Sequence, residues 1–503
     1  MREQLALLPR LLSAHLALSL FALLVGVCIS LPLAALASRR PWLAQLAQSA
    51  AALVQTIPSL ALLALMVPLL GALGWSSIGF LPAFIALVLY SLLPVLGNTI
   101  TALAHLPSEL TEAARGVGMD DWQQLTRVEL PLALPLIIAG IRTAAVWTVG
   151  AATLATPVGA DSLGNFIFSG LQTRNLSAVL VGCCAAAALA LLLDGLGKLL
   201  LSGLKQRRRS WTALALAGLA ALYLYAGAAR VWARAPDALV VGAKTFTEQY
   251  ILADVLAERL RAATQRPVRV QASLGSTVAF DALCNGDIDA YVEYSGTLWA
   301  TVMRRGAAPS DRAAMLAEIR SYLAPLGVSV AAELGFENSY ALAVQHSRAE
   351  GWRVRTIGEL ARISGGLVMG ADYEFFARPE WSALQRAYGI DFRERRSMDP
   401  ALMYQALQSG AVDVISAFST DGRIASYDLS VLADERHAIP PYDAIVLIGR
   451  RLSTREPAAA AALAKLSRSI DSERMRRANL AVDLQHQAVA DVARELGEPG
   501  RAE

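Results

Sequence analysis

The sequence predicts two domains of different fold class: an all-α transmembrane domain of about six helices, followed by a two-lobed α/β domain. Three observations support this division. The chain of 503 residues is 55% hydrophobic and only 17% charged, whereas soluble domains carry about 25% charged residues. No Asp, Glu, Lys or Arg occurs between Pro41 and Ser108. After Pro236, charged and apolar residues are mixed, and short strand-like and helical patterns alternate.

The change in composition places the domain boundary at 235/236. The transmembrane domain then covers 1–235 and the outer domain 236–503. The formal net charge is +3, from 45 Lys and Arg against 42 Asp and Glu. So small an excess gives no reason to expect a nucleic-acid partner.

Six apolar stretches are long enough to cross a membrane, since a hydrocarbon core of roughly 30 Å needs about 20 helical residues. They lie near 16–37, 46–70, 79–103, 134–156, 176–201 and 211–231. A turn-like segment from Gly71 to Ser77 separates the second from the third. A secretory signal peptide is the alternative for the first stretch, but this stretch is longer than the apolar region of such peptides.

Positive charge gathers in the loops after the first, third and fifth spans. These loops contain Arg39 and Arg40, Arg115 and Arg127, and Lys205 with Arg207, Arg208 and Arg209. Because cytoplasmic loops carry an excess of Lys and Arg, we expect these three loops in the cytoplasm. Both the N-terminus and the C-terminal domain are then expected on the outer side, with membrane lipid around the spans.

Three charged residues lie within or near the ends of the spans. Arg142 is inside the fourth span, where a charge often marks a pathway. The favoured interpretation is that Arg142 lies near the cytoplasmic end and extends its charge to the interface. Asp194 and Lys198, four residues apart, are expected to form a helical ion pair.

The loop between the third and fourth spans carries a motif of small residues. It contains Glu112, Ala113, Ala114, Gly118, Leu130 and Pro131. Small side chains let a short helix seat in a groove of another protein. In this motif the chain resembles the permease subunits of ABC importers, whose coupling loop has the same pattern. The resemblance implies that an ATPase docks on this loop; an ordinary amphipathic linker is the alternative.

The chain itself lacks the motifs of a nucleotide-hydrolysing enzyme. A phosphate-binding loop needs Gly, four residues and then Gly-Lys-Ser/Thr; the segments that begin at Gly197 and Gly242 do not have this spacing. ATP hydrolysis is therefore expected from a separate subunit. The 5 histidines and 4 cysteines show no metal-ligand spacing and no disulfide framework, so no catalytic residue, metal or cofactor is predicted.

The outer domain alternates strands and helices, which predicts an α/β fold with a mostly parallel sheet. Strands are expected at 239–243, 268–272 and 288–292 and helices at 247–264, capped by Thr247, and 276–285. A second series runs through 367–370, 402–407 and 412–416, followed by a strand at 444–448 and a helical tail. About 265 residues suffice for two lobes. We expect one lobe at 236–340 and 440–503 and the other at 341–439.

Six segments of this domain, taken in order, are similar to the binding proteins of the glycine betaine/choline/carnitine class of ABC importers. They are 242–249, 286–297, 337–342, 398–404, 419–424 and 440–443. Some members of this class fuse permease and binding protein in this order. The resemblance implies a bacterial inner-membrane importer, in two copies with two ATPases, whose outer domain binds a quaternary ammonium compatible solute.

The ligand chemistry implies an aromatic cage. A quaternary ammonium has no N–H to donate, so proteins hold it by cation–π contacts worth about 0.5–2 kcal/mol each. The resemblance assigns this role to Tyr294, Tyr340, Phe418 and Tyr442. Phe418 stands where the family commonly has Tyr; it keeps the ring face and loses the hydroxyl.

A carboxylate on the ligand requires cations and donors. Lys244, Thr297 and Arg378 match the family positions for this role. If all three contribute, a zwitterion such as glycine betaine is favoured over choline. The sequence does not separate glycine betaine, proline betaine, carnitine, choline and ergothioneine. A sensory receptor, a ligand-gated channel and an enzyme on a binding-protein scaffold are the alternatives from other functional classes.

Overall fold

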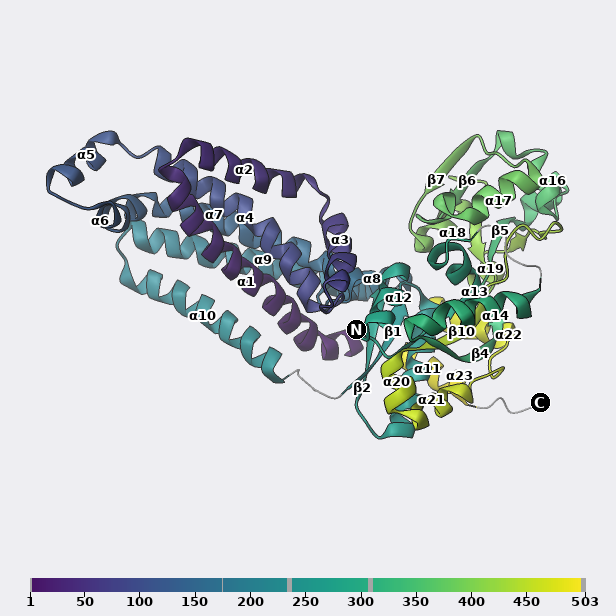
Figure 1. The fold of residues 1–503 in the computed structure, drawn as a ribbon. Helices are drawn as coiled ribbons and strands as arrows, with labels where there is room; N and C mark the ends of the chain where they lie inside the picture. Colours follow the sequence, from purple (N-terminus) through teal and green to yellow (C-terminus); the bar gives the residue numbers. More distant parts are fainter. Residues whose placement is uncertain (1, 174, 233–237, 306–310, 499–503) are drawn as a thin grey trace. The chain divides into compact units, whose positions relative to one another are not determined.

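The computed structural model describes residues 2–173, 175–232, 238–305 and 311–498. The chain divides into two compact units (Figure 1). One contains Met1–Phe168 and Ser177–Pro236, and the other contains Ser169–Leu176 and Asp237–Glu503. The domain boundary expected at 235/236 lies outside the described residues.

The membrane unit is built from long apolar helices. They are α1 (Arg2–Ser38), α2 (Pro41–Thr56), α3 (Ser59–Ala72), α4 (Phe80–Ala104), α7 (Leu130–Ala152), α9 (Leu176–Lys205) and α10 (Arg209–Trp232). Five spans are long and apolar enough to cross a membrane, and the pair α2 and α3 makes up to six if counted as one span. Helix α4 packs against α1, α2, α3 and α7, and α10 packs against α1.

The span expected at 46–70 is not one continuous helix. Helices α2 and α3 meet at an angle of 97°, with the break at Ile57 and Pro58. Proline has no N–H and disfavours a helical conformation in the residue before it, so Pro58 stops the helix. The Tyr90 hydroxyl donates to the exposed carbonyl of Ile57 at 2.5 Å. Hydrophobicity alone predicts one continuous span here, because it gives no weight to this proline.

Arg142 on α7 has a direct partner. Its Nη2 lies 2.6 Å from Asp194 Oδ1 on α9, and Lys198 Nζ lies 2.7 Å from the other oxygen of the same carboxylate. The expected pair of Asp194 and Lys198 is therefore confirmed. Arg142 was not expected in this pair, and its guanidinium joins it and links α7 to α9. The extension of its charge to the interface stays a prediction.

Short elements connect the long helices. They are α5 (Ser108–Gly116), α6 (Asp121–Gln124), a π-helical turn (Leu125–Glu129), a 3-10 turn (Thr153–Val158) and α8 (Gly164–Gln172). The first three form the loop that carries the coupling motif.

The outer unit contains two five-stranded sheets. The first has the order β2-β1-β3-β10-β4 and the second the order β7-β6-β8-β5-β9. The strands of the first are β1 (Leu239–Lys244), β2 (Val268–Leu274), β3 (Ala290–Tyr294), β4 (Ser329–Glu337) and β10 (Asp443–Ile448). Those of the second are β5 (Tyr340–Gln345), β6 (Val368–Ala371), β7 (Glu394–Ser397), β8 (Val414–Phe418) and β9 (Leu429–Val431).

Helices cover these sheets. They are α11 (Thr247–Thr264), α12 (Ser276–Asn285), α13 (Ser295–Thr297), α14 (Arg312–Leu323), α15 (His346–Trp352), α16 (Ile357–Ala361), α17 (Pro379–Tyr388), α18 (Pro400–Gln408) and α19 (Arg423–Ser426). The C-terminal part adds α20 (Arg450–Arg455), α21 (Pro457–Ala464), α22 (Ser472–Asp483) and α23 (Val489–Gly497). Helix α11 has the expected bounds, but Thr247 is its first residue and not its N-cap. Its N-cap is Phe246, and the Thr247 hydroxyl donates to Asp483 at 2.6 Å instead of capping.

The expectation of mostly parallel sheets is wrong. Strand β1 is parallel to β2 and β3, but β10 is antiparallel to both β3 and β4. In the second sheet β6 is parallel to β7 and β8, whereas β5 is antiparallel to β8 and β9. The antiparallel strands are those at which the chain crosses between the sheets, from β4 to β5 and from β9 to β10. The two crossings meet where Asn338 N donates to Tyr442 O at 3.0 Å.

Candidate functional site: an aromatic cluster in the outer domain

The four predicted ring residues lie where strands of the two sheets end or begin. Tyr294 is the last residue of β3, and Phe418 is the last residue of β8. Tyr340 opens β5, directly opposite Phe418 in the register of β5 and β8, and Tyr442 immediately precedes β10. Open α/β sheets tend to bind ligands at such strand ends. Both lobes therefore contribute rings to one place.

The rings form a single cluster with Tyr340 at its centre. The Tyr340 centroid lies 5.0 Å from that of Phe418 and 6.0 Å from that of Tyr442, whose plane is turned by 87°. Tyr294 joins through Phe246, whose ring stacks at 6.2 Å on Tyr294 and 6.4 Å on Phe418. The structure thus brings all four predicted rings together and adds Phe246 as a fifth.

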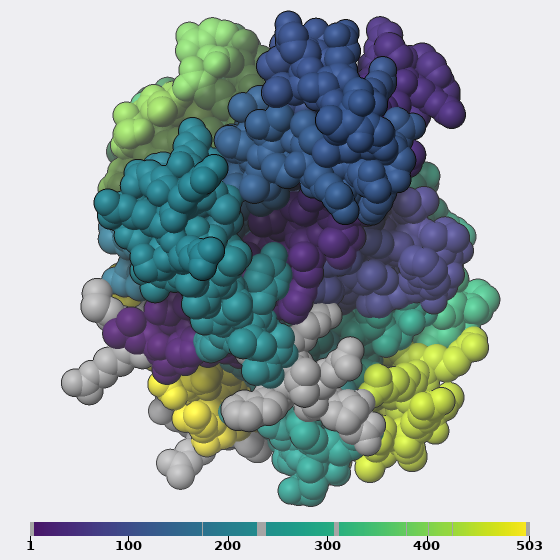
Figure 2. All heavy atoms as spheres, turned by 90° about the vertical axis from the view of Figure 1, so that its left-hand side faces the viewer, coloured from purple at the N-terminus to yellow at the C-terminus, as the bar shows by residue number. Residues whose placement is uncertain are grey.

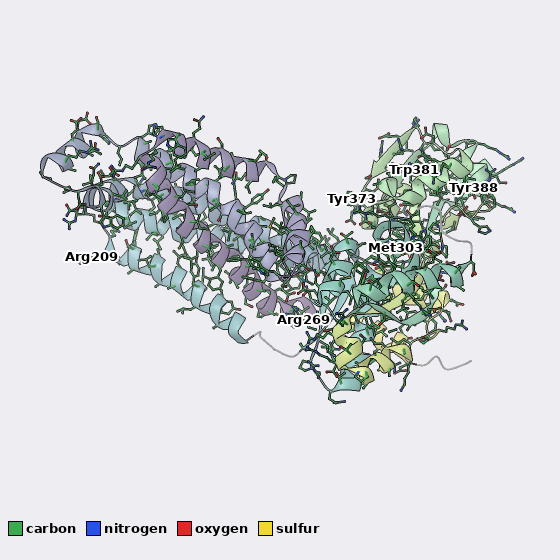
Figure 3. The ribbon with its side chains drawn as sticks, in the orientation of Figure 1. Arg209, Arg269, Met303, Tyr373, Trp381 and Tyr388 are labelled. Carbon is green, nitrogen blue, oxygen red and sulfur yellow. The ribbon has the colours of Figure 1, made fainter. Side chains whose placement is uncertain are left out.

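A second layer of aromatic side chains supports Tyr340. Phe375 lies 5.1 Å from the Tyr340 centroid, and Trp381 of α17 lies 6.0 Å behind Phe375. Trp381, labelled in Figure 3, is only 2% exposed. This packing fixes the position of the central ring.

Lys244, at the end of β1, lies next to two rings of the cluster. Its Nζ is 2.5 Å from Glu293 Oε1, 4.8 Å from the Tyr294 centroid and 5.8 Å from that of Phe246. Lys244 and Glu293 are both buried. Because a buried ammonium needs a partner, Glu293 balances its charge within the protein.

Arg378, the N-cap of α17, contacts two of the rings. Its guanidinium lies 5.3 Å from the Tyr340 centroid, and Nη2 donates to the Tyr442 hydroxyl at 3.1 Å. The guanidinium also donates to Glu374 at 3.1 Å and to Glu380 at 3.3 Å. The Tyr442 hydroxyl donates to Glu380, and burial raises the pKa of Tyr442.

Thr297 is brought to the same place by the short helix α13, which follows Tyr294 directly. It is buried, with 6% exposure. Its neighbour Gly296 lies against the face of Tyr442, where a Cβ would be 2.6 Å from two ring carbons. All seven predicted ligand residues therefore belong to one region.

Two contributors were missed by the sequence analysis, Phe246 and Glu248. The Tyr294 hydroxyl donates to Glu248 Oε1 at 2.5 Å, and the same carboxylate accepts from Asn338 and Asn479 at 2.9 and 3.1 Å. Burial raises the pKa of Glu248; burial, and next the charge of Glu248, raise the pKa of Tyr294. The available signal was their place within 242–249, one of the segments that carry the resemblance.

The predicted coupling motif forms a short exposed helix in the membrane unit. Glu112 and Ala113 of α5 are exposed, whereas Ala114 is buried. Gly118 has φ +79, a conformation that favours glycine, and it ends the turn after α5. Pro131 is exposed in the first turn of α7.

Three large apolar side chains of this loop are exposed, and Leu110 is the least exposed of them at 41%. Val117 is 75% exposed and Trp122 72% exposed. The blue segment that contains α5 and α6 lies on the surface in the space-filling view (Figure 2). Exposed apolar residues of this kind are typical of a surface that binds another protein.

Within the described residues, no group of three or more His, Cys, Asp or Glu side chains is placed to hold a metal ion. The four cysteines are free thiols, and Cys284 is half-buried.

Comparisons with known families cover both units. Residues 26–206 match the model described as the inner membrane component of binding-protein-dependent transport systems. Residues 237–496 match the model of the substrate-binding domain of ABC-type glycine betaine transport systems.

Individual proteins give the same result. The chain is 32% identical over 457 residues to the ergothioneine transport permease/ergothioneine binding protein EgtU of Helicobacter pylori (strain G27), covering 88% of this chain and 81% of that protein. It is 44% identical over 179 residues to the osmoprotectant import permease protein OsmW of Salmonella typhimurium (strain LT2), covering 36% of this chain and 83% of that protein. A solved glycine betaine/carnitine/choline ABC transporter structure is 30% identical, covers 51% of this chain and 96% of that chain, and has a TM-score of 0.45.

A permease and a ligand-binding domain in one chain define the class: a multi-pass inner-membrane transport protein for a small molecule, with an ABC ATPase as partner. The chain belongs to the family of fused permease and substrate-binding proteins of quaternary-amine ABC importers, of the glycine betaine/ergothioneine type.

Proposed function

We propose that the outer domain binds a zwitterion with a quaternary ammonium group, of the glycine betaine class. The ring cluster supplies faces for the ammonium, at about 0.5–2 kcal/mol per cation–π contact. The observation that carries the zwitterion is Arg378, whose guanidinium lies beside Tyr340 and Tyr442. Its partner Glu374 is 57% exposed at the side chain, so a ligand carboxylate can take its place.

Ergothioneine, a trimethylated amino acid, is the second candidate. Its support is the similarity over both domains to the Helicobacter pylori ergothioneine protein. Ergothioneine carries the same ammonium and carboxylate, so the cluster and Arg378 would hold both ligands in the same way. Choline and carnitine remain the further alternatives within the family.

Calorimetry on the full chain in detergent tests the cage. Glycine betaine, proline betaine, carnitine, choline and ergothioneine are titrated into the parent and into Tyr294→Ala and Tyr294→Phe. We expect Tyr294→Ala to lower the affinity for the bound ligand by roughly 2- to 30-fold, which corresponds to the loss of one cation–π contact. Tyr294→Phe keeps the ring face and should bind more tightly than Tyr294→Ala. Binding of none of the five, or equal affinity of parent and Ala variant, contradicts the proposal.

Arg378 separates zwitterions from choline in the same titrations. Arg378→Met removes the cation but keeps an unbranched apolar stem against Tyr340. Affinity for ligands with a carboxylate should fall, while affinity for choline should change less. An equal loss of affinity for choline and for the ligands with a carboxylate would mean that Arg378 acts only by positioning Tyr442.

We also propose the arrangement in which this chain works. Residues 1–235 form the conduit and 236–503 the ligand domain on the periplasmic or extracellular side, with lobes at 236–340 plus 440–503 and at 341–439. Two copies of the chain combine with two separate ATPases, which dock on the loop from Glu112 to Pro131. The exposure of Val117 and Trp122 supports the assignment.

The docking loop is tested by co-purification of the full chain with a co-expressed ABC ATPase subunit. Val117→Asp and Trp122→Glu place charges on its two most exposed apolar positions and should reduce the recovered ATPase. Leu326→Asp, at a 41% exposed position outside the membrane unit, is the control that also adds a charge. Recovery unchanged in the loop variants would contradict docking there.

A further inference from the structure

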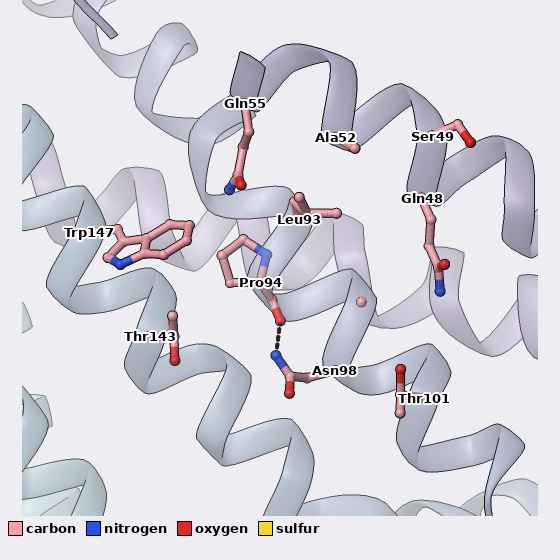
Figure 4. Close-up of a pocket in the computed structure, with 11 residues that line it drawn as sticks. Gln48, Ser49, Ala52, Gln55, Leu93, Pro94, Asn98, Thr101, Thr143 and Trp147 are labelled. Carbon is pink, nitrogen blue, oxygen red and sulfur yellow. Dashed lines mark hydrogen bonds between the residues drawn. The ribbon is translucent and has the colours of Figure 1, made fainter. Parts of the chain in front are cut away.

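The membrane unit contains a cavity that the ligand domain does not explain. Helices α2, α4 and α7 line an open cavity of about 580 Å³ (Figure 4). Small-molecule sites in proteins have volumes of about 300–1,000 Å³. The cavity is therefore large enough for a compatible solute with water around it.

The lining is polar but uncharged. Each of the three helices turns one polar face toward the cavity (Figure 4), with Gln48 and Gln55 from α2, Asn98 and Thr101 from α4, and Thr143 and Trp147 from α7. None of the 11 lining residues is ionisable. Trp147 is the single aromatic residue among them and is 50% exposed.

A polar lining of this kind is energetically unfavourable where it contacts the hydrocarbon tails of lipids. Amide and hydroxyl groups have no partners in lipid tails, so polar faces at membrane depth turn toward protein or a water-filled space. Gln48 and Gln55 are seven residues apart and therefore share one face of α2. The shared faces of three helices indicate a hydrated space.

The break between α2 and α3 lies beside this cavity and supports the same conclusion. Pro94 has no N–H for the Tyr90 carbonyl, and Gln55 Nε2 donates to that carbonyl at 3.2 Å. The Tyr90 hydroxyl in turn satisfies Ile57 O at the break. Irregular backbone at membrane depth is tolerated where it is covered by protein or lines a water-filled cavity.

We propose that this cavity is a transit site for the quaternary ammonium solute inside the membrane, with Trp147 as its cation–π contact. This inference rests on the proposed function. Neutral amides and hydroxyls solvate the ligand's polar groups there but offer no opposite charge to the ligand. The outer domain offers a cluster of five rings, whereas the cavity offers one. The weaker hold suits a site that the solute must leave.

Gly97 provides the test of passage. It lines the cavity, and an added Cβ would meet no atom within 4 Å. Gly97→Val therefore narrows the cavity, and its Cβ meets no protein atom within 4 Å. Gly195 on α9 is also free of atoms within 4 Å but does not line the cavity, so Gly195→Val is the matched control.

Uptake of radiolabelled glycine betaine, carnitine, choline and ergothioneine is measured in cells that express the full chain with its ATPase. Gly97→Val should lose most of the uptake, and Gly195→Val should keep it. Trp147→Ala should raise the KM or lower the rate by roughly 2- to 30-fold, and Trp147→Phe should recover part of the loss. Calorimetric affinity of the purified full chains should be the same for all four variants.

The possible outcomes are distinct. Normal uptake in Gly97→Val, or a loss accompanied by weaker calorimetric binding or a changed oligomeric size, overturns the transit site. If Gly97→Val is not recovered as folded protein, Gly97→Ala and the Trp147 pair decide in its place, and full uptake in both Gly97→Ala and Trp147→Ala overturns the proposal. A parent that binds and takes up none of the four solutes contradicts the proposed function instead.

Discussion

Gly296 shows how one residue without a side chain positions the cage. Its Cα lies against Tyr442, and a Cβ would be 2.6 Å from ring atoms of a side chain that is 2% exposed and bonded to Arg378 and Glu380. Gly296→Ala should therefore displace Tyr442. We expect a loss of about 1–3 kcal/mol in unfolding free energy, as for other overpacked sites, and weaker ligand binding.

Thermal unfolding and calorimetry of the full chain measure both effects. Gly351→Ala in α15, where an added Cβ would meet nothing within 4 Å, is the control and should lower neither stability nor affinity. A Gly296→Ala variant with the stability and affinity of the parent would show that the ring can move freely.

Glu248 is expected to make stability depend on pH. Burial raises the pKa of its carboxyl above the ordinary value of 4.5. Between the ordinary pKa and the raised pKa of the folded protein, the folded chain holds more protons than the unfolded chain. The free energy of unfolding therefore falls as the pH rises. Glu248→Gln cannot titrate, and relative to this variant the parent should lose stability as the pH rises from 4.5 toward neutrality.

Glu359 serves as the control of opposite sign. Backbone N–H groups of Arg355 and Thr356 lower the pKa of this exposed carboxyl, so its contribution is lost as pH falls. Melting temperatures of the parent, Glu248→Gln and Glu359→Gln from about pH 3 to neutrality report both effects, because the Glu359 contribution is lost below the ordinary carboxyl pKa. If the melting temperatures of the parent and of Glu248→Gln depended on pH in the same way, the raised pKa of Glu248 would be contradicted.

At the scale of elements, the ion pair between α7 and α9 is expected to hold the membrane unit together. Asp194→Asn leaves Arg142 without a carboxylate at a partly buried position, and breaking a buried pair costs about 3–5 kcal/mol, less here because both side chains retain 21–23% exposure. Lys198→Met removes the more exposed partner, 64% exposed, and should cost little. Thermal unfolding in detergent compares the two variants, and equal losses would contradict the difference between the two partners.

The same scale explains the mixed sheets. Only two residues separate the end of β4 at Glu337 from Tyr340, which opens β5, so the chain leaves one sheet and enters the other at that point. Strand β10 brings the chain back beside β4. The ring residues Tyr340 and Tyr442 therefore belong to the crossing strands, which is why rings of both lobes meet.

At the scale of the molecule, each unit has its own core. The outer unit is organised around a cluster that includes Leu239, Ile251 and Leu342, and the membrane unit around separate clusters such as that of Leu16, Leu20 and Leu193. Covalent connection then acts chiefly through effective concentration, about millimolar for short flexible linkers.

Expression of 1–232 and 238–503 as separate chains tests this role. Uptake should fall at low outer-domain concentration and recover as the separate domain approaches about millimolar levels. Full uptake at micromolar domain would mean that the two parts bind each other without help from the connection. Calorimetry on the separate domain confirms that it still binds ligand.

The sequence by itself determined the class of each domain, because hydrophobic length and the alternation of strands and helices are local properties. It also identified four rings through short segments, since Tyr294, Tyr340, Phe418 and Tyr442 lie within or directly beside recognisable motifs. Only the tertiary structure decided what surrounds them. Phe246 between two rings, Glu248 beneath Tyr294, and the pairing of Lys244 with Glu293 depend on contacts between residues far apart in the chain. The break at Pro58 and the polar cavity likewise arise from helices that meet in space, and hydrophobicity along one stretch carries no information about its neighbours.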